Sequence, residues 1–481
     1  MKAKRFGNVG VGSITGWGAC ALVGALGAIK PANAEPAPLY AHMEPVMLDS
    51  GVLDNPSNEP AVVFTRILDL GPDVPWVRVL FSDANLPPGS YVRVTSLLDG
   101  DSQTLDAAGL ADWGNGTAFF NGSAVRIELV AGARSAGNVV RTERLFVGEV
   151  PPPVQGGVAA ICDTADDRQA STDKRVGRLL NTEARPEGEN TVFPLGICTG
   201  FIIDKPAGPD DKLHLTAGHC FRDRCAGLLP KDPSYVFQFN VVCVNGTEPT
   251  CSNPNCNIYH PPAADQFPVI GDSVRSWDGA VRGTANDWAV FKCGKSNNQT
   301  TFVHQGNGPQ AMFTLGDPTN LFLGSPIRIT GYGADGNGPG GGGPPSACKC
   351  DPGAVPATGT RNATLQTAIG DLIDVAGTII EYTTDACGGN SGSPIIGPGD
   401  KAFGIHTFGR LSCDGVTTNI NGGTAITHPF LQDAIAALAP GGSQAAICIP
   451  TLSAWGLIIL GLSVASAATV VILRRRAVSA G

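Results

Sequence analysis

The 481-residue sequence lacks the features that mark several common classes of protein. It has no glycine-rich phosphate-binding loop and no dinucleotide-binding fingerprint, so nothing in it indicates a nucleotide-dependent enzyme. No Cys-x2-Cys pair stands at ligand spacing from a histidine, so we expect neither a metal site nor a cofactor. Acidic residues (42) outnumber basic residues (33), which argues against nucleic acid as a partner.

Cysteine is absent from residues 35–161, although the whole chain has 14. Cys20 and Cys448 lie near the two ends, and the other 12 fall between Cys162 and Cys413. An even number suits six disulfides in an oxidising compartment. The cysteines therefore predict a protein that works outside the cytoplasm and has two parts of different composition.

Both ends of the chain resemble targeting segments. Residues 1–34 have a basic start, an apolar run and the small residues Ala32–Ala34, which together predict a secretory signal peptide; an uncleaved anchor is the alternative. At the other end, Ile449–Gly456 precedes an apolar run that reaches Leu473 and then Arg474–Arg476. The run is just long enough for one transmembrane helix, with the arginines on the cytoplasmic side. We therefore expect this helix within residues 449–476.

The stretch Pro151–Gly157 predicts a linker, assigned to residues 151–161, between a domain at 35–150 and a domain at 162–440. In the first domain, short alternating runs such as Trp76–Phe81 and Val125–Val130 lie between Pro/Gly turns. This pattern predicts an all-β sandwich. Its role as a folding aid, an inhibitory propeptide or a binding module stays open.

The second domain also has the pattern of an all-β fold, and one helix is expected at Pro429–Leu438. The expected strands are Cys198–Ile203, Leu213–Thr216, Tyr235–Val242, Trp288–Phe291, Ile327–Tyr332, Asp374–Tyr382, Ser393–Ile396, Ala402–His406 and Thr424–Thr427.

One segment, Thr384–Pro394, has the pattern of an exposed nucleophile. Its Ser391 has a glycine two positions before it and another directly after it, whereas Ser393 lacks this arrangement. Gly389 lets the backbone bend so that the N–H groups of Gly389 and Ser391 can form an oxyanion hole.

Two further segments supply a base and an acid. A serine hydroxyl needs a base to remove its proton, and an imidazole needs an acid to fix its tautomer. Leu215–Cys220 places His219 after a tight bend, and Asn286–Phe291 places Asp287 directly before an apolar strand. Asp278 is the nearest alternative acid, but its surroundings predict a turn.

In this order, the three segments resemble the chymotrypsin/trypsin-like serine peptidases, particularly their secreted bacterial branch. The resemblance covers roughly residues 162–438 and includes the strand that begins at Cys198. It implies two six-stranded antiparallel barrels and a catalytic triad of His219, Asp287 and Ser391. It also implies two disulfides, Cys198–Cys220 and Cys387–Cys413.

The C-terminal Ile-Pro-Thr-Leu sequence resembles a sorting signal of Gram-negative bacteria that exosortase-like membrane enzymes handle. A plain tail anchor is the alternative. The resemblance implies membrane sorting machinery as a partner, and a product that is membrane-anchored, on the cell surface or secreted.

Two residues give opposite indications about the substrate. Asp385, six residues before Ser391, matches the trypsin-like aspartate that binds Lys or Arg, and Gly409 and Gly423 match glycines that keep such a pocket open. His406 instead matches a histidine that binds acidic side chains in the staphylococcal-type glutamyl endopeptidases. We expect cleavage after Lys or Arg, with cleavage after Glu or Asp as the alternative.

Asn390 bears on activation. In most animal-type members an aspartate at this position binds a newly cut N-terminal amine, and an asparagine cannot supply the charge. Arg175-Val176 resembles an activation site only superficially, so we expect activity without a new terminus at Val176. The expected function is thus a serine endopeptidase that acts on protein or peptide substrates. A non-catalytic surface binding protein on the same scaffold is the alternative from another class.

Overall fold

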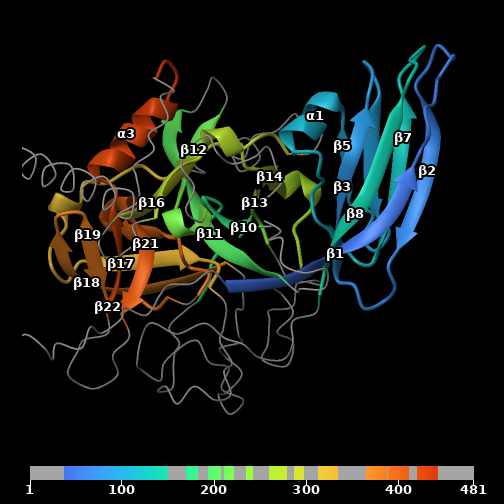
Figure 1. The fold of residues 1–481 in the computed structure, drawn as a ribbon. Helices are drawn as coiled ribbons and strands as arrows, with labels where there is room; N and C mark the ends of the chain where they lie inside the picture. The colour runs from blue at the N-terminus through green and yellow to red at the C-terminus, as the bar shows by residue number, and fades with distance from the viewer. Residues whose placement is uncertain are drawn as a thin grey trace, which may run out of the picture. The chain divides into compact units, whose positions relative to one another are not determined.

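Strands make up nearly all of the regular structure in the computed structural model (Figure 1). The structure describes residues 37–149, 169–181, 193–206, 211–221, 235–241, 259–278, 286–296, 312–333, 365–386, 388–410 and 420–442. All the described residues belong to one compact unit. The N-terminal elements are β1 (Ala37–Asp49), β2 (Ala61–Asp69), β3 (Trp76–Asn85), β4 (Tyr91–Ser96), β5 (Ser102–Leu105), α1 (Ala107–Asp112), β6 (Phe120–Asn121), β7 (Ala124–Ala131) and β8 (Val139–Gly148).

The N-terminal strands belong to two sheets. One has four strands in the order β2-β7-β4-β5, and the strands β1-β8-β3-β6 form one end of an 11-stranded sheet. Alternating residues such as Val92 and Val94 of β4 and Val125 and Ile127 of β7 are fully buried. This alternation is what a sheet with one covered face requires. A separate β-sandwich domain stays a prediction, because half of these strands share a sheet with the rest of the chain.

The remaining strands of the 11-stranded sheet form a first barrel-like group. They are β10 (Val176–Asn181), β11 (Phe193–Pro206), β12 (Lys212–Thr216), β13 (Tyr235–Gln238), β14 (Gln266–Pro268), β15 (Arg275–Asp278) and β16 (Asp287–Phe291). Every pairing among them is antiparallel. The core between them is apolar and aromatic, with Phe201, Phe237 and Phe291 fully buried.

A second group of strands closes on itself. It contains β17 (Pro326–Gly331), β18 (Gln366–Ala376), β19 (Ile379–Tyr382), β20 (Pro394–Gly397), β21 (Lys401–Arg410) and β22 (Ile420–Ala425), with the short β9 (Gln169–Ala170) at the edge of β18. The order β17-β20-β21-β22-β19-β18, with a further β17–β18 pairing, is a closed ring of six strands. The all-β prediction is confirmed, and the sheets are barrel-like as the trypsin-like resemblance implied.

Two expected strands are wrong. The strand expected at Thr424–Thr427 is instead β22, which begins at Ile420 and ends at Ala425. The sequence pattern predicted a single strand at Asp374–Tyr382, but β18 ends at Ala376 and β19 begins at Ile379. Gly377 between them has a φ of +61°, a conformation that favours glycine, and it turns the chain into a hairpin. The apolar residues on both sides gave no sign of the turn.

The expected helix at Pro429–Leu438 is present with those bounds as α3, and its Leu431, Ala434, Ile435 and Leu438 are buried. Among the described residues, no helix is long and apolar enough to cross a membrane. The predicted signal peptide, the linker 151–161 and the predicted transmembrane helix at 449–476 lie outside the described residues.

Strand β1 joins the N-terminal strands to the first barrel-like group. Its first residues pair with β11 over Ala37–Ala41, and the rest pairs with β8 up to Asp49. In Figure 1, β1 runs from the blue N-terminal strands to the green β11. The sheet therefore continues from one part of the chain into the other, and no linker is needed to hold the two parts together.

Candidate active site

His219 and Asp287 form the polar centre of the candidate site. His219 lies in the short 3-10 helix Gly218–Phe221 that follows β12, and Asp287 is the first residue of β16, which pairs with β12. The backbone N–H of His219 donates to Asp287 Oδ1 at 3.0 Å, and His219 Nδ1 lies 2.6 Å from Asp287 Oδ2. A carboxylate only accepts hydrogen bonds, so Nδ1 carries the proton and Nε2 is left as a base.

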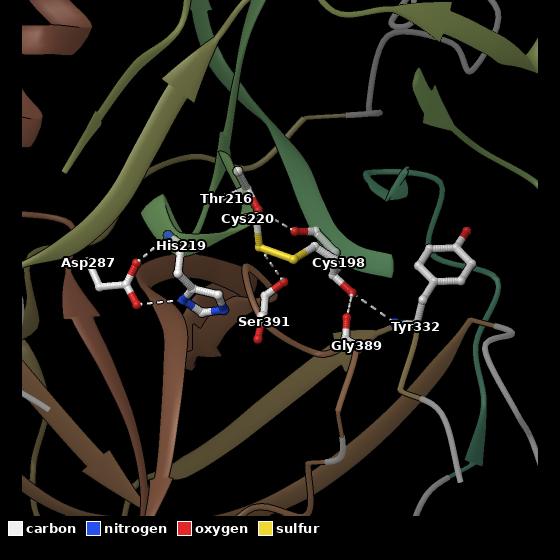
Figure 2. The surroundings of a disulfide bond; sticks show 9 residues. Cys198, Thr216, His219, Cys220, Asp287, Tyr332, Gly389 and Ser391 are labelled. Carbon is white, nitrogen blue, oxygen red and sulfur yellow. Dashed lines mark hydrogen bonds and ion pairs between the residues drawn. A yellow bond between two sulfur atoms is a disulfide. The ribbon is translucent and has the colours of Figure 1, made fainter. Parts of the chain in front are cut away.

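Ser391 lies beside the imidazole (Figure 2). Its Oγ is buried, which departs from the exposed hydroxyl that the sequence pattern predicted, and His219 Nε2 is buried as well. Neither atom makes a hydrogen bond to any residue that the structure describes. The Cys198–Cys220 disulfide, which the resemblance implied, is formed next to the pair, and Cys220 Sγ lies 3.8 Å from the Ser391 carbonyl oxygen. The disulfide thus links the histidine segment to β11 and also contacts the backbone of the serine.

Two glycines shape the loop that carries Ser391. Gly389 and Gly392 have φ values of +96° and +90°, where an L side chain is strained. At Gly392 a Cβ would also lie 2.1 Å from both the Thr199 carbonyl oxygen and Thr216 Oγ1. Only glycine fits there, which explains the glycine directly after the serine.

The alternative residues, His214 and Asp278, lie in strands β12 and β15. His214 packs between Phe237 and Phe291 in the core, as expected of a structural histidine. The turn expected at Asp278 is wrong, because Asp278 ends strand β15 and is the register partner of Asp287. Asp287 is therefore the aspartate whose carboxylate the structure brings to His219.

The two specificity candidates are both buried. Asp385 follows β19 and is 6% exposed. His406 lies in β21, where its N–H donates to the Ser393 carbonyl and its carbonyl accepts from the Gly392 N–H, both at 2.8 Å. Its Nδ1 is hydrogen-bonded to the Tyr382 hydroxyl. Burial, with a smaller contribution from His219, lowers the pKa of His406 to about 3, so the ring is neutral near neutral pH.

The two predicted pocket glycines lie on neighbouring strands. Gly423 is the register partner of His406, and Gly409 that of Asn421. A Cβ on Gly423 would lie 1.9 Å from the Ile405 carbonyl oxygen, so close strand packing already requires glycine there. The predicted Cys387–Cys413 disulfide lies outside the described residues.

The cysteine expectation needs one correction. Cys293 is a buried free thiol among the described residues, which departs from the expected six disulfides. Burial raises its pKa well above the usual value, so it is an inert thiol. Ligand atoms of Cys198, His219 and Cys220 lie within 4.8 Å of one another, but the two sulfurs are in the disulfide and are not thiolate ligands.

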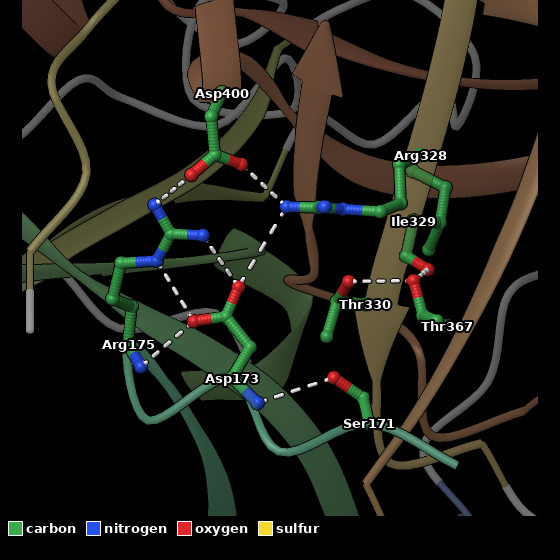
Figure 3. Close-up of polar contacts among 8 residues, drawn as sticks. All are labelled: Ser171, Asp173, Arg175, Arg328, Ile329, Thr330, Thr367 and Asp400. Atoms are coloured by element: carbon green, nitrogen blue, oxygen red, sulfur yellow. Dashed lines mark hydrogen bonds and ion pairs between the residues drawn. The ribbon is translucent and has the colours of Figure 1, made fainter. Parts of the chain in front are cut away.

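Arg175 is held in a cluster of charges rather than presented for cleavage (Figure 3). It donates to Asp173 through Nε at 2.8 Å and Nη2 at 2.6 Å, and to Asp400 through Nη1 at 2.6 Å. Arg328 binds Asp400 from the other side, and the guanidinium of Arg175 lies 3.8 Å from the ring centroid of Phe313.

The sequence pattern did not single out two residues that the structure brings to the site. Tyr382 binds His406, and Thr199 binds the carbonyl oxygens of the serine loop. Thr199 lies in the Cys-Thr-Gly sequence that begins the expected strand before His219. A threonine at that position is also an ordinary strand residue, so the sequence alone gave no distinct signal.

Comparison with known families identifies the class. Residues 194–428 match the family model described as Trypsin, and residues 448–476 match the model described as IPTL-CTERM motif. Residues 194–428 are therefore a trypsin-like serine protease domain, and residues 448–476 carry a C-terminal sorting motif of the IPTL type. No curated protein matches the sequence at a significant level.

Several solved structures are similar to part of this chain. A Glu endopeptidase in complex with MPD is 17% identical, with 56% of this chain and 96% of that chain covered and a TM-score of 0.33. The scabies mite inactivated protease paralogue S-I1 is 13% identical, with 53% and 92% covered and a TM-score of 0.32. The thermostable serine protease AL20 from an extremophilic microorganism is 14% identical, with 53% and 91% covered and a TM-score of 0.32. At these identities and TM-scores, no activity or specificity is transferred from them.

Proposed function

We propose that this protein is an exported serine endopeptidase that cleaves peptide bonds through Ser391, His219 and Asp287. The observation that carries the proposal is the pair of contacts from the Asp287 carboxylate to the N–H and Nδ1 of one histidine. They leave Nε2 as the base on the side of the ring where Ser391 lies. This is the division of roles that an acyl-transfer triad needs.

The mechanism follows from these roles. His219 Nε2 takes the Ser391 proton while Oγ attacks the carbonyl carbon of the substrate, and the N–H groups of Gly389 and Ser391 stabilise the oxyanion. The intermediate collapses to an acyl-enzyme as the imidazolium gives its proton to the leaving amine. Water, activated by the same imidazole, then releases the acid and restores Ser391.

We propose cleavage after Lys or Arg, with Asp385 as the residue that binds the basic side chain. The electrostatics of His406 support this choice, because a neutral imidazole offers an acidic substrate side chain no charge. The cleavage-after-Glu alternative would depend on hydrogen bonding by His406 alone. We further propose that the IPTL-type motif at 448–476 directs the protein to membrane sorting machinery, so that it acts outside the cytoplasm.

P1 profiling on a mixed peptide library tests the proposal. The protein from Glu35 to Gly442 is profiled with Ser391→Ala as the inactive control. We expect cleavage after Lys and Arg that disappears in Ser391→Ala. Asp385→Ser should lower kcat/KM after Arg by about 100-fold or more, because a buried charge-assisted contact is lost.

Three other results would change the assignment. Cleavage after Glu moves the specificity to His406. Unchanged preference for Arg in Asp385→Ser removes Asp385 from the pocket. No reaction of the mature protein with a serine-directed covalent inhibitor favours the surface binding protein.

A further inference from the structure

One residue of β11, Thr199, holds the loop that carries Ser391. Thr199 is fully buried. Its hydroxyl donates to the Gly389 carbonyl oxygen at 2.8 Å and accepts from the Tyr332 N–H at 2.9 Å. Its N–H donates to the Ser391 carbonyl oxygen at 2.8 Å. Thr199 therefore binds both ends of the segment 389–391 from the opposite barrel-like group.

The carbonyl between these two is also fixed, because Asn390 accepts from the Ser393 N–H at 2.9 Å. The C=O and N–H of a planar trans peptide unit point in opposite directions. Three fixed carbonyls thus set the directions of the next three N–H groups. The Gly392 N–H accordingly reaches the His406 carbonyl. The Ser391 N–H, a proposed oxyanion donor, has no hydrogen-bond partner among the described residues.

Thr199 also binds the segment that carries the histidine. Its carbonyl oxygen accepts from Thr216 Oγ1 at 2.6 Å. Thr216 ends β12 and lies three residues before His219. Gly392 packs against the same two threonines. Thr199 therefore contacts both the loop that carries Ser391 and the segment that carries His219.

The side-chain oxygens that surround Gly331 beside this loop are uncharged. The side-chain oxygens of Thr199, Asn390 and Ser393 converge on Gly331, where a Cβ would lie 2.8, 2.5 and 2.1 Å from them. The residue before the nucleophile is therefore packed among neutral oxygens. Val176, the first residue of a hypothetical cut chain, is 1% exposed in β10 and pairs with Phe201.

We propose that Thr199 is a positioning residue whose hydroxyl orders the oxyanion hole, so that the loop is in its working form without a new N-terminal amine. The inference rests on the proposed serine protease function. A hydrogen bond from a hydroxyl to the Gly389 carbonyl requires no prior cleavage. It fixes the peptide plane that follows the Gly389 N–H, one proposed oxyanion donor. The Thr199 N–H fixes the peptide plane that follows the Ser391 N–H, the other proposed donor.

The test compares Thr199→Val with Thr199→Ser in the exported full chain. Valine keeps the shape and removes the hydroxyl, so we expect kcat to fall about 10- to 100-fold with KM nearly unchanged, as for a contact that matters most in the transition state. Serine keeps the hydroxyl and should restore kcat to within about threefold. Affinity for a peptide aldehyde should fall in step with kcat/KM.

The matched control is Thr117→Val, which removes an equally buried threonine hydroxyl between α1 and β6. It should lower the melting temperature but leave kcat unchanged. If Thr199→Val does not fold, Thr199→Ala carries the same comparison with Thr199→Ser.

The inference is overturned by full kcat in the valine or alanine variant, or by a serine variant as slow as valine. Hydrolysis by the unmodified protein distinguishes failure of this inference from failure of the proposed function. If that protein shows no Ser391-dependent hydrolysis, the function itself is wrong and the role of Thr199 falls with it.

Discussion

At the scale of single residues, the strongest feature is the double contact between Asp287 and His219. One carboxylate oxygen fixes where the histidine backbone lies, and the other fixes which ring nitrogen holds the proton. Asp287 is only 5% exposed, so water does not compete strongly for these bonds. The carboxylate therefore acts on the position and on the tautomer of His219 together.

Asp287→Asn separates these two effects. The amide can still accept one hydrogen bond, but it cannot accept from both the backbone N–H and Nδ1–H as a carboxylate does. We expect kcat to fall by about 10³- to 10⁴-fold with little change in KM, because the base is held in the wrong tautomer. Kinetics on an Arg-containing peptide measure this.

The exposed Asp374 on β18 supplies the control, since Asp374→Asn makes the same chemical change away from the site. It should be fully active. A kcat for Asp287→Asn within about tenfold of the unmodified protein would mean that another group orients His219.

Residues differ in how far the sequence predicts them. Each residue of the proposed triad (His219, Asp287 and Ser391) has small or apolar sequence neighbours that are typical of its proposed catalytic role. Thr199 and Tyr382 act through hydrogen bonds to residues far away in the chain, and an isolated Thr or Tyr in a strand looks like an ordinary β-former. These contacts became visible only in the fold, which brings the partners together.

At the scale of elements, the segment before β10 fastens one barrel-like group to the other. β9 adds to the edge of β18, and Arg175 then binds Asp400, which lies between β20 and β21. Burial alone would lower the pKa of Arg175, but its hydrogen bonds to Asp173 and Asp400 outweigh this and raise it above the ordinary value. The hydrogen bond from Arg175 likewise lowers the pKa of Asp400.

Arg175→Gln tests whether this segment is a clamp or an activation site. We expect the free energy of unfolding to drop by about 1–3 kcal/mol, between the values for exposed and fully buried ion pairs. Turnover of small peptides should be retained, because Val176 is already built into β10 and need not become a new terminus. Denaturant melts and peptide kinetics give the two readouts.

The exposed Arg66 on β2 makes no ion pair among the residues described, so Arg66→Gln should change neither readout. An Arg175→Gln protein that is stable but cannot be activated, even when residues upstream have been removed, would restore the activation-site interpretation.

Elements show the same limit on prediction from sequence. Strands with clear alternation, such as those at Trp76–Phe81 and Val125–Val130, and the helix α3 are present where the pattern predicts them. The turn at Gly377 was missed because apolar residues flank it on both sides. In the charge cluster, Arg175 binds both Asp173 and Asp400. Arg175 and Asp400 are 225 positions apart in the chain, so no local sequence pattern predicts their contact.

At the scale of the whole molecule, the N-terminal strands are built into the rest of the fold. Gln266 of β14 accepts from the Phe119 N–H at 3.0 Å and donates to the Phe119 carbonyl at 2.8 Å, with both residues fully buried. Asn121 makes two further bonds with the backbone of His260, each at 2.9 Å. Separating the two parts would leave these buried polar groups without their partners across the junction, which makes separation costly.

The Phe119 and His260 rings stack at 4.4 Å between centroids on the same junction. Burial lowers the pKa of His260 well below its usual value, so the ring is neutral there and accepts apolar neighbours. Together with the β1 pairing to both β8 and β11, these contacts favour a permanent structural part over a propeptide that leaves.

Cutting the chain at the junction tests this interpretation. If residues 151–161 are replaced by a site for an orthogonal protease, we expect the two fragments to elute together after cleavage and to keep their activity. Gln266→Leu should raise the dissociation constant of the fragments by about tenfold or more, because it removes the two buried hydrogen bonds to Phe119 that cross the junction. Gln432→Leu, which removes one glutamine bond in α3, should leave it unchanged. Fragments that separate without denaturant, with a rise in activity, would instead identify the N-terminal part as an inhibitory propeptide.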